Sequence, residues 1–300
     1  MKTRREAALE RRRKKKELIN TETINREDNS KTKKGKALNN GRDAGPEITN
    51  AGAEKLKIIP IRPEESARRK DLRELHPNLP DVYSGQLIAL VAPIRSSKST
   101  TWNNFLHNEN FYKDLFNDVF IISNTIATDA TSRFSYKQFK NTCYEIYNDS
   151  IINGIVKQQR AKIDNDEEDT SYALILDDLL GQFPKNGRKG AAAIHFSTRF
   201  RHYVKPNSGD PCLVLYSTQR YFDLSRIVRN NATGLLFSGN IKSRKEWESI
   251  MDDYADTFGG RQNFEEMIRR VQEVPYTWLY LRLDTKPPQA LMNFQEQLYP

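Results

Sequence analysis

The sequence predicts an α/β fold: a doubly wound, mostly parallel sheet flanked by helices. From about Leu56 onward, short apolar runs alternate with helical stretches, as in parallel α/β proteins. The runs lack a polar/apolar alternation, which is typical of strands buried on both faces. With 300 residues and 34.8 kDa, the chain is long enough for one large α/β domain.

Five apolar runs are expected to form the core of the sheet. They are residues 86–92, 118–122, 173–176, 211–216 and 234–237. Helices are expected at 98–107, 135–147, 191–203, 243–257 and 263–272. The run 276–284 predicts an added edge strand or one half of a hairpin. The core then spans about 85–240 of a domain covering 56–300, with C-terminal helices and the edge strand in 241–300.

Residues 1–55 predict a disordered basic arm. Residues 1–50 contain 15 basic and 8 acidic side chains, so most of the net charge of +9 lies there. Two blocks of like charge, 11–16 and 31–36, are separated by polar residues with almost nothing apolar to bury. Three roles stay open for this arm: binding nucleic acid, directing nuclear import, or serving as a solvated tail.

Several classes of protein are disfavoured by composition. Cys143 and Cys212 cannot form a disulfide framework, and no Cys/His spacing indicates zinc. The longest apolar stretches run about eight residues, whereas a membrane-spanning helix needs roughly 20. Charged residues follow Met1 without an apolar segment, so no secretory signal is expected. We expect a soluble protein of a reducing compartment with no membrane partner.

A phosphate-binding loop is indicated after the first apolar run. Lys98 and Ser99 match the last two positions of the P-loop pattern G-x-x-x-x-G-K-[ST]. In such a loop, backbone N–H groups surround a phosphate at a helix N-terminus, Lys98 would reach the β and γ phosphates, and Ser99 would hold Mg²⁺. The candidate nucleotide-binding residues are Ala92, Pro93, Ile94, Arg95, Ser96, Ser97, Lys98, Ser99 and Thr100.

The two glycine positions of this pattern are substituted. Ala92 is a mild change, because the first position mainly ends the strand. Ser97 is the more serious one, since a Cβ before the lysine hinders close approach of the backbone to a phosphate. An ordinary strand–turn–helix connection with a serine N-cap is the alternative for this segment.

Two carboxylates follow another buried strand. Asp177 and Asp178 come directly after the apolar run 173–176. P-loop NTPases hold their metal ion and the attacking water with acids in this position, so Asp177 would ligate Mg²⁺ and Asp178 would activate the water. The alternative is a strand that meets an Asp-rich turn.

Gln219 is the third polar element at a strand end. It follows the apolar run 211–216 through Ser217 and Thr218. Ligands of open α/β sheets lie at the carboxyl ends of the strands. Gln219 is therefore predicted to contact the γ-phosphate or the attacking water.

Together, these residues resemble the FtsK–HerA superfamily of DNA-pumping ATPases, most closely the genome-packaging ATPases of tailless double-stranded DNA viruses. The resemblance covers about 85–239. It rests on the Walker B-like segment 174–178, the Arg-His segment 200–203, the sensor strand at 217–219, and the Arg-x-Asn segment 227–231 with the strand after it. The departure from the family pattern is Ser97, where the family has glycine.

The resemblance implies a P-loop NTPase fold of the RecA/ASCE type that binds ATP and Mg²⁺. It also implies a homo-oligomeric ring, hexameric or pentameric, with ATP bound between neighbouring subunits. Such rings use an arginine to stabilise the charge of the transferred phosphoryl group. Arg229 is the first candidate for this arginine, Arg201 the second and Arg226 the third.

Double-stranded DNA is the implied substrate of the ring. The segment 182–190 follows Walker B and contains Lys185, Arg188 and Lys189, which could hold DNA phosphates without recognising base sequence. A solvated basic loop is the alternative. A capsid vertex protein is a further implied partner, and the implied location is intracellular, at virion assembly sites in the host cytoplasm or nucleus, with association with the virion.

Three functions are compatible with these features. The first is an ATP-driven motor that packages double-stranded DNA into a viral capsid. The second is a catalytically impaired P-loop protein that binds DNA or supports assembly, which Ser97 and Ala92 favour and Asp177, Asp178 and Gln219 oppose. The third is a non-viral FtsK/HerA-like ATPase that transfers DNA.

Overall fold

In the computed structural model, residues 72–179 and 191–299 are described, and the fold below is that of these two stretches. The predicted arm (1–55) and the predicted DNA contacts Lys185, Arg188 and Lys189 lie outside them.

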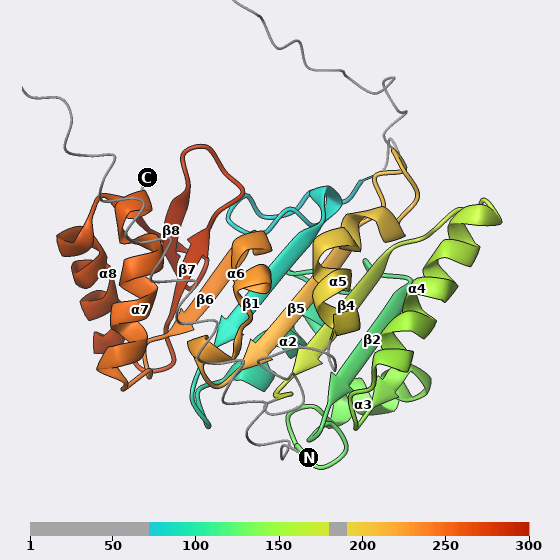
Figure 1. The fold of residues 1–300 in the computed structure, drawn as a ribbon, viewed down its shortest axis with the longest axis horizontal. Helices are drawn as coiled ribbons and strands as arrows, with labels where there is room; N and C mark the ends of the chain where they lie inside the picture. Colours follow the sequence, from blue (N-terminus) through green and yellow to red (C-terminus); the bar gives the residue numbers. More distant parts are fainter. Residues whose placement is uncertain (1–71, 180–190, 300) are drawn as a thin grey trace, which may run out of the picture. The chain divides into compact units, whose positions relative to one another are not determined.

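A nine-stranded sheet forms the centre of the described fold (Figure 1). Its strands are β1 (Gln86–Val91), β2 (Asp118–Ser123), β3 (Cys143–Tyr144), β4 (Tyr172–Asp177), β5 (Cys212–Thr218), β6 (Gly234–Ser238), β7 (Trp278–Arg282), β8 (Gln289–Met292) and β9 (Glu296–Tyr299). The order is β3-β2-β4-β5-β1-β6-β7-β8-β9. The first six strands of this order pair in parallel, and β7, β8 and β9 are added antiparallel.

The α-helices of the described stretches are α2 (Lys98–His107), α3 (Arg133–Gln138), α4 (Asp149–Asp164), α5 (Ala191–Arg199), α6 (Arg226–Asn231), α7 (Arg244–Tyr254) and α8 (Arg261–Glu273). Short 3₁₀ turns include η2 (Val82–Ser84), η3 (Lys140–Thr142), η4 (Phe200–Tyr203), η5 (Tyr221–Asp223) and η6 (Ala255–Phe258). The strand order places β5 between β1 and β4, which confirms the predicted ASCE-type arrangement.

Helices cover both faces of the sheet, which explains why its strands are apolar throughout. In β1, Leu87 and Val91 point to a layer that includes residues of α4, α5, α7 and α8. Ile88 and Leu90 point to the opposite layer, which contains Trp102 and Phe105 of α2. Figure 1 shows α4 to α7 on one side of the sheet and α2 behind it. Each of these strand residues is fully buried, so no solvent-facing alternation arises.

The predicted core strands are all present, and one prediction near an edge of the sheet is wrong. The segment 135–147 contains the end of α3, the turn η3 and β3 instead of one helix. The run 276–284 contains β7, which pairs antiparallel with β6 and with the following strand β8, so of the two predicted possibilities it is one half of a hairpin and not an edge strand. Helix α4 was not predicted from the sequence, because its buried face is limited to Ile152, Ile155 and Gln159.

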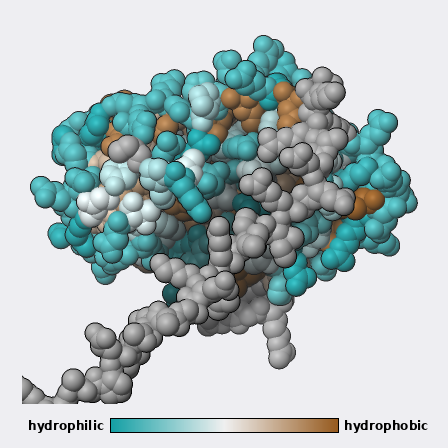
Figure 2. Space-filling view, turned by 90° about the horizontal axis from the view of Figure 1, so that it is seen from above, coloured by the Kyte–Doolittle hydropathy of each residue, from teal (hydrophilic) through white to brown (hydrophobic). Residues whose placement is uncertain are grey.

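No helix within the described stretches is long and apolar enough to cross a membrane. The face seen in Figure 2 is mostly hydrophilic, with apolar groups in small separate patches.

Gly239, directly after β6, allows close packing against α8. A Cβ at this position would lie 2.2 Å from the carbonyl oxygen of Val271. We expect Gly239→Ala to lower the free energy of unfolding by about 2 kcal/mol, because a main-chain atom must move. Gly154 in α4 is the matched control: a Cβ added there would have nothing within 4 Å, so Gly154→Ala should stabilise by roughly 0.5–1 kcal/mol. Denaturant unfolding measures both, and equal effects of the two variants would contradict this packing.

Candidate functional site

The carboxyl ends of β1, β4 and β5 bring the predicted site residues to one edge of the sheet. Val91 is in register with Thr218, and Asp177 is in register with Ser217. The phosphate loop follows β1 and continues into α2, so its lysine starts a helix beside the strand ends. The sheet thus brings these segments together at one edge.

The loop before α2 has a backbone conformation that suits glycine. Ser97 is the N-cap of α2 and has a φ of 65°, in the left-handed region. Arg95 also has a positive φ, of 60°. The Ser97 side chain makes no capping hydrogen bond, while its carbonyl oxygen accepts from the amide and the hydroxyl of Thr101 at 2.8 and 2.9 Å. A serine therefore has a backbone conformation that favours glycine, at the position where the phosphate-loop pattern has glycine.

Lys98 points back into the loop. Its amine is buried and donates hydrogen bonds to the carbonyl oxygens of Ala92 at 2.9 Å and Pro93 at 3.3 Å. Burial lowers the pKa of Lys98, and the nearby carboxylates of Asp178 and Asp177 oppose that change. The amine thus lies within the electrostatic reach of both predicted acids.

Asp177 is a buried carboxylate with one oxygen that lacks a partner. Its side chain is 3% exposed, and Oδ2 accepts a hydrogen bond from the Ser123 hydroxyl at 3.0 Å. Oδ1 is buried and has no hydrogen-bond partner among the described residues. Burial raises the pKa of Asp177, while the nearby hydroxyls of Ser217 and Ser123 act in the opposite direction. An unsatisfied buried oxygen at this place suits a cation or a water molecule.

Asp178 is held by Gln219. The Gln219 amide nitrogen donates to both carboxylate oxygens of Asp178, at 3.0 and 2.8 Å. The Asp178 main chain continues the parallel pairing, because its N–H donates to the Ser217 carbonyl at 2.9 Å. Its φ of 50° lies in the left-handed region, directly after the last residue of β4. Gln219 therefore reaches the acid predicted to activate water.

The donor set fits Mg²⁺ bound together with phosphates. No group of three or more His, Cys, Asp or Glu side chains comes together in residues 72–179 and 191–299, so this part of the chain contains no self-sufficient metal cage. Mg²⁺ is usually bound through one or two carboxylates plus substrate phosphates. Asp177, with its orphaned Oδ1, and Ser99, in the first turn of α2, provide such a partial set.

Among the described residues, none of the three candidate arginines makes a hydrogen bond or an ion pair with the side chains of Lys98, Asp177, Asp178 or Gln219. Arg229 donates to Asp253 at 2.6 Å, and its guanidinium lies 4.7 Å from the ring centre of Tyr221. Arg201 packs beside Gly85, where a Cβ would be 2.8 Å from its Cγ. Gly85 precedes β1, so Arg201 lies roughly 20 Å from the loop, at the opposite edge of the sheet. Arg226 is exposed at the start of α6. An arginine finger from any of them stays a prediction about a neighbouring subunit.

Five residues beside the loop were not predicted from the sequence. They line a cavity of about 670 Å³ together with the loop residues 93–96 and Gln219, and they are Arg220, Asn240, Lys242, Ser243 and Glu246. Asn240 and Lys242 follow β6, the parallel neighbour of β1. The rule that ligands lie beyond the carboxyl ends of strands could have indicated them, because it applies to β6 as much as to β5.

Known proteins are similar to this chain in structure but not in sequence. No protein-family model and no curated protein matches it. The genome packaging NTPase B204 from Sulfolobus turreted icosahedral virus 2, in complex with ATP-gammaS, is 18% identical over 68% of this chain and 95% of that chain, with a TM-score of 0.45. B204, the DNA-packaging ATPase from Sulfolobus Turreted Icosahedral Virus, is 15% identical over 71% and 97%, with a TM-score of 0.48. EssC (ATPases 2 and 3) from Geobacillus thermodenitrificans is 12% identical over 72% and 39%, with a TM-score of 0.40.

Replacing Ser97 with glycine should stabilise the protein. Glycine adopts the observed φ of 65° without the cost that a Cβ imposes, and no capping hydrogen bond is lost. We expect Ser97→Gly to raise the free energy of unfolding by about 0.5–1 kcal/mol. Thr100→Gly, inside the first turns of α2, is the control and should lower it by a similar amount. A loss of stability in Ser97→Gly would contradict the strained loop.

Removing the charge of Asp177 should also stabilise the protein without ligand. Because burial raises the pKa of Asp177, the folded state binds the proton more tightly, and stability falls as the pH rises from the unfolded pKa through the folded pKa. Asp177→Asn should therefore gain on the order of 1 kcal/mol at neutral pH and nothing in acid, where the carboxyl is protonated in both states. Unfolding curves across this pH range provide the measurement.

Asp118 supplies the matched control for this charge effect. It forms an ion pair with Lys162 at 2.7 Å, so Asp118→Asn removes a favourable partner instead of an orphaned charge. We expect that variant to lose about 0.5 kcal/mol at neutral pH. A change of stability in the same direction in both Asn variants would show that the orphaned charge of Asp177 has no special cost.

Proposed function

We propose that this chain is an ATPase of the FtsK–HerA superfamily that works as a ring-shaped motor packaging double-stranded DNA into a viral capsid. The observation that supports it most is the convergence of Lys98, Asp177, Asp178 and Gln219 at one sheet edge. A phosphate-loop lysine, a buried metal-binding acid, and a second acid held by an amide are the parts that hydrolysis of a nucleoside triphosphate requires.

In the proposed hydrolysis of ATP, each side chain of the site has a separate role. The loop N–H groups and the Lys98 amine bind the β and γ phosphates, after the amine leaves the carbonyl oxygens of Ala92 and Pro93. Ser99 and Asp177 would hold Mg²⁺, which when bound neutralises charge on the phosphate oxygens. Asp178 accepts a proton from the water that attacks the γ-phosphorus in line, and the bond from phosphorus to the β–γ bridging oxygen breaks to release ADP.

Gln219 is proposed to control the water-activating acid. While its amide donates to both oxygens of Asp178, the amide occupies the side of the carboxylate that would otherwise contact the attacking water. A γ-phosphate close to the strand end gives the Gln219 amide a second acceptor. The release of Asp178 would then depend on the bound nucleotide, which couples hydrolysis to occupancy of the site.

The sequence resemblance supports three further parts of the proposal: DNA as the substrate, the ring, and the capsid partner. DNA binding is also supported by the basic segment that contains Lys185, Arg188 and Lys189. A basic segment directly after the Walker B strand lies next to the catalytic acids in the chain. Phosphate contacts of this kind bind DNA without reading its sequence, as a packaging motor requires. Action at virion assembly sites inside the host cell is part of the same proposal.

A catalytically impaired DNA-binding or assembly protein is the second candidate. The observation that favours it is Ser97, which has a left-handed φ and carries a Cβ where the phosphate-loop pattern has glycine, and a Cβ there hinders close approach of a phosphate to the backbone. The two candidates differ in turnover and share DNA binding.

ATP hydrolysis with and without long double-stranded DNA distinguishes them. We expect DNA-stimulated turnover in the unmodified protein and a loss of roughly 10²-fold or more in Lys98→Ala, because a charge on the transferred phosphoryl group loses its partner. Lys113→Ala is the matched control, since this exposed lysine pairs only locally with Glu109 at 2.9 Å. If the protein binds DNA but does not hydrolyse ATP, the motor proposal is wrong and the second candidate function takes its place.

A further inference from the structure

The cavity beside the phosphate loop extends from the loop to the first turn of α7. Its walls are residues 93–96 of the loop, Gln219 and Arg220 after β5, and Asn240, Lys242 and Ser243 after β6, and Glu246 of α7 contributes to the lining. Arg95, Arg220 and Lys242 are exposed cations around it, and Glu246 is the one acid among the described residues that line it. The excess of positive charge suits a polyphosphate ligand. The carboxylate of Glu246 would accept a hydrogen bond from a donor group on that ligand.

The strand order fixes which part of a nucleotide this cavity can receive. Asp177 and Asp178, which would face the γ-phosphate, follow β4 on the β5 side of β1. Glu246 and the segment 239–243 follow β6, on the other side of β1. A nucleotide whose last phosphate points toward β4 must extend its ribose and base away from β4, toward β6. The wall formed by α7 therefore faces the nucleoside.

Glu246 is an unsatisfied acceptor at that wall. Glu246 is only 6% exposed. Its Oε1 is buried and has no hydrogen-bond partner among the described residues. The Nε of Arg220 lies 3.6 Å from Oε1, which is an ion pair beyond hydrogen-bond distance. Burial raises the pKa of Glu246, and the charge of Arg220 opposes this shift. A buried carboxylate oxygen in this state gains from a donated hydrogen bond.

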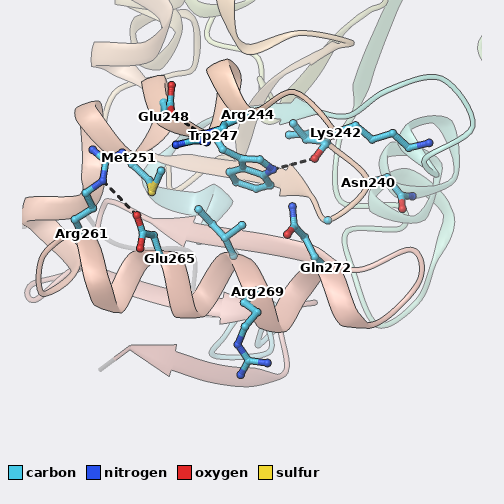
Figure 3. Close-up of a pocket in the computed structure, with 13 residues that line it drawn as sticks. Asn240, Lys242, Arg244, Trp247, Glu248, Met251, Arg261, Glu265, Arg269 and Gln272 are labelled. Carbon is cyan, nitrogen blue, oxygen red and sulfur yellow. Dashed lines mark hydrogen bonds and ion pairs between the residues drawn. The ribbon is translucent and has the colours of Figure 1, made fainter.

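A second cavity of about 590 Å³ between α7 and α8 is the competing place for a ligand (Figure 3). Its arginines and glutamates already have partners: Arg261 pairs with Glu265 at 3.3 Å, and Arg244 with Glu248 at 2.8 Å. The Trp247 indole donates to the Ile241 carbonyl at 2.9 Å, as the dashed line in Figure 3 shows. No orphaned buried polar atom points to a ligand among the described residues that line this cavity.

We infer that Glu246 is a specificity-determining residue for the nucleoside, whose buried Oε1 accepts a hydrogen bond from a ribose hydroxyl of the bound nucleotide. The inference rests on the proposed function, because it requires a nucleotide in the phosphate loop. A carboxylate is the usual protein partner of a ribose hydroxyl in dinucleotide sites, where it accepts from the same group. Arg220 acts as a positioning residue that holds the carboxylate at the wall of the cavity.

Binding of Mg·ATP, Mg·2′-deoxyATP and Mg·3′-deoxyATP to the full chain tests this assignment by titration calorimetry. The unmodified protein should bind at least one deoxy analogue about tenfold more weakly than ATP, which is the cost of one charge-assisted hydrogen bond. Glu246→Ala should reduce that difference to less than about twofold. Glu246→Gln keeps the size of the side chain and a neutral acceptor, so it should bind ATP about threefold more tightly than the deoxy analogue. This variant provides the test if Glu246→Ala does not fold.

Two controls separate this inference from the proposed function. Glu248→Ala removes an exposed acid two positions along the same helix and should keep the full preference for ribose. Lys98→Ala should weaken ATP and both deoxy analogues equally, because it acts on the phosphates. Equal affinity of all three nucleotides for the unmodified protein, or the full preference of about tenfold surviving in either Glu246 variant, would overturn the inference and leave nucleotide binding intact.

The remaining possible outcome is that Glu246 contacts the base of the nucleotide instead of the ribose. If Glu246→Ala changes the preference for ATP over inosine triphosphate but not the preference for ribose, the carboxylate contacts the amino group of the base, and the ribose assignment is wrong. Absence of binding for every nucleotide would refute the proposed function itself and the inference with it.

Discussion

The parallel pairing of β1, β4 and β5 is the constraint on which the candidate site depends, since it aligns the carboxyl ends of all three strands at one edge. A shift by one residue would reverse the side chains of a strand between the two core layers, so burial on both faces holds the register. That register pairs Asp177 with Ser217 and Val91 with Thr218. The strand register that packs the core therefore also brings Asp177, Gln219 and the phosphate loop near one another.

Without ligand, the polar groups of the site hold one another in place. The Lys98 amine donates to carbonyl oxygens of its own loop, Gln219 holds both oxygens of Asp178, and Asp177 keeps one buried oxygen without a partner among the described residues. Each arrangement costs stability or uses a hydrogen bond that a nucleotide would replace. The strained φ of Ser97 adds to this cost. Part of the folding free energy is thus spent on the arrangement of polar groups at the proposed phosphate and cation site.

The sequence predicts the core of this fold well because its strands are buried on both faces and its acids stand directly at strand ends. Apolar runs around Leu87 and Leu174 leave few alternatives, and the segment from Lys98 onward starts a helix as expected. The edges were harder to predict. The short β3 depends on pairing with β2, and β8 and β9 depend on pairing that begins at β7. Glu246 was missed because its burial and its orphaned oxygen arise only when α7 packs beside the loop.

The most direct measurement is a high-resolution structure of the protein with Mg²⁺ and a non-hydrolysable ATP analogue. We expect the β and γ phosphates at the N-terminus of α2, with the Lys98 amine moved from the Ala92 and Pro93 carbonyls onto phosphate oxygens. We also expect the cation beside Ser99 and the free oxygen of Asp177. A nucleotide bound elsewhere, with Lys98 still on its own loop, would contradict the central claim that this sheet edge is a nucleotide-hydrolysing site.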